Sequence, residues 1–340
     1  MGYRIALDAM GGDHGPGEIV PAAIHALKKH RDLELLLVGL EDIIKPRLAH
    51  LNHELAVRIQ VLHAPEVVTM DEAPSSALRN KKNSSMRFAI EQVKKGQAQA
   101  CVSAGNTGAL MAISRYILKM LPGIDRPAIC TIIPGINSHT HILDLGANVD
   151  SSPEQLFQFA VMGAELTGAV ENIRAPKVAL LNVGTEENKG NDRVKKAKIL
   201  LDRSHINFIG FVEGNHIYSG DADVIVCDGF VGNIALKASE GVVEFFLHHV
   251  TDGFQQNLYS KLAALVSKPI LESIHRKTDP RRHNGASLLG LRGIVIKSHG
   301  SADRLSFAHA IEEAMLEVEK NIPARITSRL EVLLTSTLSR

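Results

Sequence analysis

The stretch IALDAMGGDHGP, residues 5–16, decides the class of fold. Its apolar start leads directly into a polar turn with three glycines and two acidic residues, and an amphipathic helical pattern follows over residues 17–30. A short apolar run, a glycine-rich turn and a helix are typical of the strand–turn–helix unit of α/β proteins. The turn itself is open to three interpretations here: a phosphate-cradling glycine loop, a metal site or a tight turn.

Short apolar runs alternate with amphipathic stretches along the rest of the chain. Strands are expected at residues 4–8, 34–38, 58–62, 98–103, 128–133, 141–144, 177–183, 207–212, 223–228 and 293–298. The clearest helices are expected at residues 17–30, 84–95, 153–170 and 303–321. This alternation predicts a three-layer α/β/α fold around a mostly parallel sheet. Because no repeat or linker divides the chain, we expect a single domain over residues 1–340.

The composition is that of a soluble globular protein without a nucleic-acid partner. The 340 residues are 45% hydrophobic and 22% charged, and their formal net charge of +1 gives no field that would attract nucleic acid. Cys101, Cys130 and Cys227 each lie in an apolar run, so we expect buried, reduced cysteines rather than a catalytic thiol. Arg4 and Asp8 interrupt the first apolar stretch, and we expect a cytoplasmic protein without a signal peptide or transmembrane helix.

Six polar turns follow the predicted strands, at the place where open α/β sheets bind ligands. They cover residues 8–15, 103–109, 144–150, 182–191, 228–233 and 297–303. Their glycines let a ligand approach the backbone, and their Asn, Ser and Thr residues can cap a helix whose free N–H groups attract an anion. We therefore expect the turns to line one polar cleft that can hold phosphate.

Several standard signatures are absent. No G-x-G-x-x-G follows a strand, no G-x-x-x-x-G-K-[ST] occurs, and neither G-x-S-x-G nor H-E-x-x-H is present. The acidic residues of the turns leave a hard-cation site open as an alternative, although such residues more often cap helices or tie turns together. The candidate ligands for that alternative are Asp8, Asp13, His14, Asp144, Asp150 and Asp228.

Two basic side chains in the turns are candidates for anion binding or proton transfer. Lys189 lies among glycines and asparagines, where a cation is better explained by an anionic ligand than by packing. His299 follows Lys297 at a strand end, directly before a helix, where a neutral imidazole suits hydrogen bonding or general-base work. An ordinary turn residue is the alternative for His299.

Residues 253–284 form a basic segment with helically spaced apolar residues. The basic residues are Lys261, Lys268, Arg276, Lys277, Arg281 and Arg282, against Glu272 and Asp279. The apolar residues are Phe254, Leu258, Leu262, Leu265 and Val266. Two interpretations stay open: a helical excursion that packs on a partner subunit, or a patch that touches an anionic membrane surface or an acidic protein.

Six motifs together resemble one family. They are ALDAMGGDHGP, ACVSAGNTGALM, DLGANVD, DVIVCDGFVGN, HNGASLLGLRG and VIKSHGSAD. In this order they are similar to the bacterial phosphate acyltransferase (PlsX) family, the acyl-[acyl-carrier-protein]:phosphate acyltransferases. The resemblance covers the chain from residue 4 to about residue 330.

The resemblance implies an enzyme of lipid synthesis. Members are soluble homodimers whose fold is similar to that of the isocitrate/isopropylmalate dehydrogenases and the phosphotransacetylases. They transfer a fatty acyl group from acyl-[acyl-carrier-protein] to inorganic phosphate, without a nucleotide, another cofactor or a required metal. The acyl phosphate passes to a membrane acyltransferase that acylates glycerol 3-phosphate. Members also associate peripherally with the inner face of the cell membrane, through the region that corresponds to residues 253–284.

The site residues follow from the resemblance and from the turns. Lys189 and Asn233 match the family's proposed active-site positions. The polar turns add the backbone N–H groups of Asn106, Thr107 and Gly108 as phosphate contacts. They also add His299 and Lys297, which could transfer the proton or bind phosphate, and Asp8 as a substrate contact. Two alternatives remain: a nicotinamide-dependent, metal-assisted hydroxyacid dehydrogenase on the same fold, and a non-catalytic regulator that binds acyl-carrier protein.

Overall fold

The computed structural model of the chain describes residues 2–136, 138–278 and 284–338. The elements of the first part are β1 (Tyr3–Asp8), α1 (Pro16–Lys29), β2 (Leu33–Gly39), α2 (Glu41–Leu48), α3 (His53–Ala56), β3 (Ile59–His63), α4 (Pro74–Asn80), α5 (Ser85–Lys94), β4 (Ala100–Ser103), α6 (Thr107–Leu118) and β5 (Ala128–Pro134). Those of the second part are β6 (His139–Leu143), α7 (Pro153–Val170), β7 (Val178–Leu181), α8 (Asp192–Asp202), β8 (Phe208–Val212), the 3₁₀ helix η1 (Gly214–Tyr218), β9 (Val224–Val226), α9 (Gly229–Gln255), α10 (Leu258–Thr278), β10 (Ala286–Leu289), β11 (Ile294–Lys297), α11 (Arg304–Lys320) and α12 (Ile322–Leu338).

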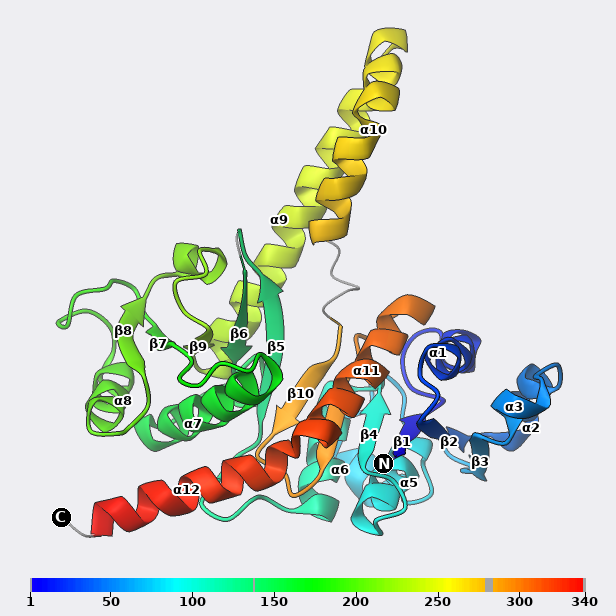
Figure 1. Cartoon of the computed structure of the whole chain (residues 1–340), viewed down its shortest axis with the longest axis horizontal. Helices are drawn as coiled ribbons and strands as arrows, with labels where there is room; N and C mark the ends of the chain where they lie inside the picture. Colours follow the sequence, from blue (N-terminus) through cyan, green and yellow to red (C-terminus); the bar gives the residue numbers. More distant parts are fainter. Residues whose placement is uncertain (1, 137, 279–283, 339–340) are drawn as a thin grey trace.

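One continuous sheet of eleven strands forms the centre of the molecule, with helices on both faces (Figure 1). The strand order is β3-β2-β1-β4-β11-β10-β5-β6-β9-β7-β8. Parallel pairs predominate, and only the pairs β11–β10, β10–β5 and β5–β6 are antiparallel among the described strands. The predicted three-layer α/β/α class with a mostly parallel sheet is confirmed.

The alternation of side chains in β1 shows why the sheet is covered on both faces. Ile5 and Leu7 are fully buried against α1 and α11, whereas Ala6 points to the other face, toward α5 and α6. Because every second residue of a strand points to the same face, an apolar run that is buried on both sides needs helices on both. Phe307 of α11 is fully buried in the first of these layers.

The three antiparallel pairings reverse the direction of the sheet. β1, β4 and β11 are parallel to each other, and so are β6, β9 and β7. Three successive antiparallel steps lie between β11 and β6, so the second group runs opposite to the first. The carboxyl ends of the two groups therefore point to opposite edges of the sheet.

The helices α9 and α10 pack on each other and project from the body as a two-helix hairpin (Figure 1). The sequence predicts an excursion that starts at Gly253, but this residue lies in the last turn of α9, and the hairpin is built from residue 229 onward. The helical spacing of the apolar residues correctly predicted a helical excursion. The excess of basic residues marked only its second helix, α10. Asp279, Arg281 and Arg282 lie outside the described residues.

All ten expected strands are present. The eleventh strand, β10, is missing from the sequence prediction. Its sequence ASLL is only four residues long and is flanked by Gly285 and Gly290, so it carries no periodicity. The helix predicted at 303–321 is α11. It ends where Asn321 adopts a left-handed backbone conformation, and α12 begins at the next residue, Ile322.

Among the described helices, none is long and apolar enough to cross a lipid bilayer.

Candidate functional site

The carboxyl ends of β1, β4 and β11 meet at one edge of the sheet, and polar side chains gather there. Asp8, which ends β1, accepts a hydrogen bond from Ser103 Oγ at 2.7 Å. Lys297, which ends β11, donates from Nζ to the carbonyl oxygen of Ala104 at 3.4 Å and to that of Ser298. We call Asp8, Ser103 and Lys297, with the turns 8–15, 103–109 and 297–303, the Asp8–Lys297 cluster.

Both charged groups of this cluster are buried, and burial shifts both pKa values toward the neutral form. Burial raises the pKa of Asp8, although hydrogen bonds from Ser103 and Ser85 and the charge of Lys297 oppose the shift. Burial lowers the pKa of Lys297 to about 8, against the charges of Asp13 and Asp8. In the described part of the chain, Asp8 Oδ1 has no hydrogen-bond partner. Buried ionisable groups with shifted pKa values are typical of functional sites.

The turn that follows β1 packs directly on the turn that follows β11. The N–H of Asp13 donates to the carbonyl oxygen of Gly300 at 2.8 Å. Gly12 has a φ of 81°, and a Cβ at this position would lie 2.8 Å from the same oxygen. Only glycine tolerates this combination of backbone angle and close approach. Residues 8–15 thus form a tight turn that makes one wall of the cluster.

His299 lies in the turn after β11 and is exposed to solvent. Its backbone N–H donates to Asn284 Oδ1 at 2.9 Å, and its Nδ1 lies 2.8 Å from Ser301 Oγ. Asn284 in turn donates from Nδ2 to Ser298 Oγ at 2.8 Å. The turn is therefore fixed by side chains, and in the described part of the chain Nε2 of the exposed imidazole makes no hydrogen bond.

Asn106 is the N-cap of α6, and its side chain is fully occupied in this role. Its Oδ1 accepts from the N–H of Ala109 at 2.9 Å, and its Nδ2 donates to two backbone carbonyls of residues 70 and 72 at 2.7 and 3.1 Å. The next N–H groups, of Thr107 and Gly108, are at the start of the helix and have no carbonyl partner within it. This helix terminus is the part of the predicted turn that can attract an anion.

The carboxyl ends of β6, β9 and β7 meet at the other edge, where a second group of turns is organised by Asp144. This buried carboxylate accepts from the N–H groups of Ile129, Ala147 and Asn148 at 2.9, 3.1 and 2.7 Å. Burial raises its pKa, although these bonds oppose the shift. Asp228 caps α9 by accepting from the N–H of Val231 at 2.9 Å. Both acids tie the backbone together.

Asn233 lies in the first turns of α9, against the turn 144–150. A Cβ on Gly232 would overlap the carbonyl oxygen of Asp144, so only glycine lets the helix approach this closely. The next residue is the half-buried Asn233, whose side chain would lie 3.6 Å from a Cβ added to Gly146. The start of α9 therefore holds this amide at the edge of the turn.

Lys189 lies on the turn after β7, with an exposed side chain. Its backbone is held by Asn182, whose Nδ2 donates to the Lys189 carbonyl at 3.3 Å, and by its own N–H bond to Glu186 at 3.1 Å. Among all the residues that the structure describes, no carboxylate lies within ion-pair distance of the Lys189 ammonium. We call Lys189, Asn233 and the turns 144–150, 182–191 and 228–233 the Lys189–Asn233 cluster.

The two clusters lie at opposite edges of the sheet. Three strand spacings of about 4.8 Å, and the length of a strand, separate the end of β11 from the end of β6. No hydrogen bond or ion pair among the described residues joins Asp8, Lys297 or His299 to Lys189 or Asn233. The expectation of one cleft lined by all six turns is therefore wrong for a single chain, because the sheet reverses direction between them.

The same separation divides the candidate ligands of the hard-cation alternative within one chain. Asp8 and Asp13 belong to one edge, whereas Asp144, Asp150 and Asp228 belong to the other. In the described residues these acids do not gather into a group of three ligand atoms.

The three cysteines are free and buried, as predicted, and burial raises the pKa of each thiol.

Several residues of the clusters were missed by sequence reasoning. Ser85 and Ser103 hydrogen-bond to Asp8, Asn148 donates to Asp144, and Asn284 orients the turn of His299. Asn148 lies in the same turn as Asp144, four residues along the chain. Ser85, Ser103 and Asn284 are far in sequence from the residues that they hold, so only the tertiary fold brings them together.

Comparison with known proteins now adds the identity of the family. The chain matches the family model described as "Fatty acid synthesis protein" over residues 3–325. The phosphate acyltransferase of Nitrosococcus oceani is 54% identical over 331 residues, which cover 97% of each chain. That of Coxiella burnetii is 57% identical over 333 residues, again 97% of each chain. The chain belongs to the phosphate acyltransferase family.

The family and the fold agree. A phosphotransacetylase from Streptococcus pyogenes has a TM-score of 0.61 and covers 94% of each chain at 18% sequence identity, a likeness that shows the fold. As a member of the family the chain is an acyltransferase, and acyl transfer that involves phosphate is its chemistry. The dehydrogenase and the non-catalytic regulator are thereby disfavoured.

The shifted pKa of Lys297 predicts a specific pH dependence of stability. Because the folded-state pKa of about 8 lies below the ordinary value of 10.5, burying the charged amine destabilises the fold below pH 8. This cost disappears as the pH rises from about 8 to about 10.5, where the amine is neutral in both states. At pH 7, the free energy of unfolding of Lys297→Met, measured by denaturant titration, should therefore exceed that of the parent by roughly 2–3 kcal/mol. This difference should shrink above pH 8. If the difference in unfolding free energy is constant from pH 7 to 10, the lowered pKa of Lys297 is contradicted.

Proposed function

We propose that the chain transfers a fatty acyl group from acyl-[acyl-carrier-protein] to inorganic phosphate. The observation that carries this proposal is the identity of 54–57% to relatives named phosphate acyltransferase over nearly the whole chain. The acyl phosphate would then serve a membrane acyltransferase that acylates glycerol 3-phosphate in phospholipid synthesis.

The reaction asks for positioning rather than for a protein nucleophile. An oxygen of phosphate attacks the thioester carbonyl, a C–O bond forms and the C–S bond breaks, and the pantetheine thiolate leaves with the proton that phosphate gives up. The site must hold a dianion beside a carbonyl and stabilise the oxyanion that develops. Ammonium groups, amide donors and helix N-termini do this.

The Lys189–Asn233 cluster offers two of these groups. The Lys189 ammonium is exposed and has no carboxylate partner in the described chain, so it is available to an anion. The amide of Asn233 is held at the N-terminus of α9, where the helix dipole adds to its attraction for negative charge. We assign phosphate and oxyanion contacts to these two side chains.

The Asp8–Lys297 cluster offers the others. The N–H groups of Thr107 and Gly108 start α6 on its rim, and Lys297 is a buried cation whose charge Asp8 helps to maintain. His299 is exposed beside them with a free Nε2. We assign to Lys297 and His299 the phosphate contact and the handling of the proton, and to Asp8 the orientation of Lys297.

Two clusters at opposite edges of one chain cannot hold the same phosphate. A symmetric homodimer removes this difficulty if the partner subunit's Lys189 and the partner subunit's Asn233 face the Asp8–Lys297 cluster. A closed two-fold arrangement creates two identical composite sites of this kind. Such sites require both subunits, and we propose this arrangement.

The hairpin of α9 and α10 supports both a dimer and a membrane contact. Large apolar side chains are exposed along it, among them Phe245 and Phe246 of α9 and Tyr259, Leu262 and Val266 of α10. Patches of this kind mark protein or membrane interfaces. We propose that the base of the hairpin packs on the partner and that its outer half, which we call the tip, contacts the inner face of the cytoplasmic membrane. This outer half includes Lys261 and, halfway along α10, Lys268.

Removal of Lys189 or Asn233 tests the phosphate contacts. Lys189→Ala and Asn233→Ala should each lower acyl phosphate formation by at least about 100-fold, because each removes a charge or donor that acts on the developing oxyanion. Asn233→Asp, which keeps the shape but loses the donor, should be equally impaired. Lys196→Ala, an exposed lysine of the neighbouring helix α8, is the matched control. Near-normal turnover of both alanine variants overturns the assignment.

Mixing two inactive variants tests the composite site. When Lys189→Ala and Lys297→Met chains are co-expressed, half of the dimers are heterodimers, each with one intact and one doubly defective site. Activity should recover to roughly a quarter of the parent level. No recovery above the average of the two homodimers means that each site lies within one chain.

Charge reversal tests the membrane contact. Lys261→Glu with Lys268→Glu should reduce flotation with vesicles of anionic lipid by at least about tenfold, since each lysine contributes about 1 kcal/mol at such a surface. Lys237→Glu, an exposed lysine near the base of α9, is the control. Equal flotation of both variants excludes the proposed tip contact.

A further inference from the structure

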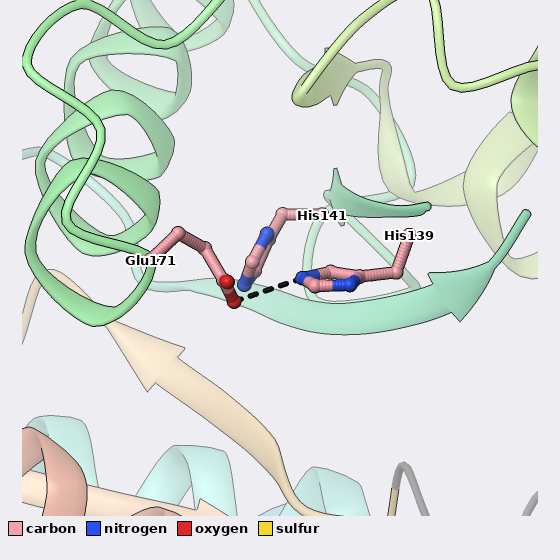
Figure 2. A group of neighbouring side chains, drawn as sticks. All are labelled: His139, His141 and Glu171. Atoms are coloured by element: carbon pink, nitrogen blue, oxygen red, sulfur yellow. Dashed lines mark hydrogen bonds and ion pairs between the residues drawn. The ribbon is translucent and has the colours of Figure 1, made fainter. Parts of the chain in front are cut away.

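Two histidines and a glutamate come together at the start of β6, away from both clusters. Figure 2 shows His139 and His141 of β6 beside Glu171, the residue that follows α7. One ligand atom from each of the three lies within 4.8 Å of the other two. His139 Nε2 and Glu171 Oε1 are 2.8 Å apart.

The strand geometry explains why both histidines are present. Residues 139 and 141 are two apart in an extended strand, so their side chains leave the same face of β6. The strand is fixed on both sides, since His141 pairs with Ile132 of β5 and with Val224 of β9. Glu171 is brought to this face by the end of α7, where it is the C-cap.

His141 is the unusual member of the group. Its side chain is only 2% exposed, and neither ring nitrogen has a hydrogen-bond partner among the described residues. A buried polar atom without a partner destabilises the fold, and a bound water or ion is a common reason why such an atom is kept. Burial lowers the pKa of His141 to about 3, so the ring is neutral and keeps a lone pair.

We propose that His139, His141 and Glu171 bind one divalent transition-metal ion, with zinc as the preferred ion. Two imidazole nitrogens and one carboxylate are ligands that suit zinc, whereas magnesium and calcium prefer oxygen alone. Zinc–ligand bonds of about 2.0–2.1 Å place ligand atoms about 3.3 Å apart, which a small rearrangement of side chains achieves. His139 and Glu171 are partly exposed, so an ion can enter and a water can complete the coordination.

The role that the position supports is structural. The ion would connect the first residues of β6, in the second half of the sheet, to the end of the helix α7. Asp144, which organises the Lys189–Asn233 cluster, follows the opposite end of the same strand. Zinc binding is therefore expected to be independent of Lys189 and of catalysis.

Zinc titration of the full-length chain tests the proposal. After treatment with a chelator, the protein should bind one equivalent of zinc in competition with a chromophoric chelator, and zinc should raise its Tm. His139→Ala and Glu171→Gln each remove one ligand at a partly exposed position, where the fold tolerates the change. Each should weaken this binding by at least about tenfold and abolish the shift in Tm.

A matched control uses another histidine that contacts a glutamate. His309 Nδ1 lies 3.4 Å from Glu312 Oε2, but there the Lys29 ammonium shares the carboxylate at 2.7 Å, which disfavours a second cation. His309→Ala should bind zinc like the parent, and Lys189→Ala should do so as well. Failure of the parent to bind one equivalent, or equal binding by His139→Ala and Glu171→Gln, overturns the proposal.

Discussion

The reversal of strand direction in the middle of the sheet is the constraint on which the rest of the structure depends. β10 and β5 are inserted between two groups of parallel strands, and the three antiparallel pairings turn the second group over. Polar turns follow the carboxyl ends of strands in both groups. They are consequently divided between two edges, and the composite site proposed above depends on this division.

Each edge is held rigid by close backbone contacts and by buried acids rather than by the ligand. At one edge the turns of Gly12 and Gly300 touch, and Asp8 binds Ser103 and attracts Lys297. At the other edge Asp144 collects three backbone N–H groups, and Gly232 lets α9 approach. Preorganised donors of this kind lose little entropy on binding, which is what positioning of a phosphate and a carbonyl requires.

Most of the fold could be predicted because its information is local. The run from Ile5 to Leu7, the turn at Gly11 and Gly12 and the following helix each carry a periodic or conformational signal. The short strand β10 has none. Its two antiparallel pairings leave β5 parallel to β11, and the antiparallel pairing of β5 with β6 then reverses the direction of the sheet. β5 and β6 were both expected as strands, but their antiparallel pairing was not, and for this reason the six turns were expected to line one cleft.

The site was predictable in its parts but not in its arrangement. Lys297 and Lys189 stand out as cations in glycine-rich turns, whereas Asn106 Nδ2 donates to carbonyl oxygens of residues 70 and 72, more than thirty residues away in sequence. His139 and His141 carried a local signal, two histidines at the spacing of a strand face, but Glu171 joins them only through the fold. Contacts between distant turns cannot be obtained from spacing.

The most direct test of the central claim is the formation of acyl phosphate by the purified chain, trapped as acyl hydroxamate. With acyl-[acyl-carrier-protein] and inorganic phosphate alone, product should accumulate in proportion to time and should require phosphate. Absence of acyl hydroxamate under these conditions, or its formation at the same rate without phosphate, would contradict the account.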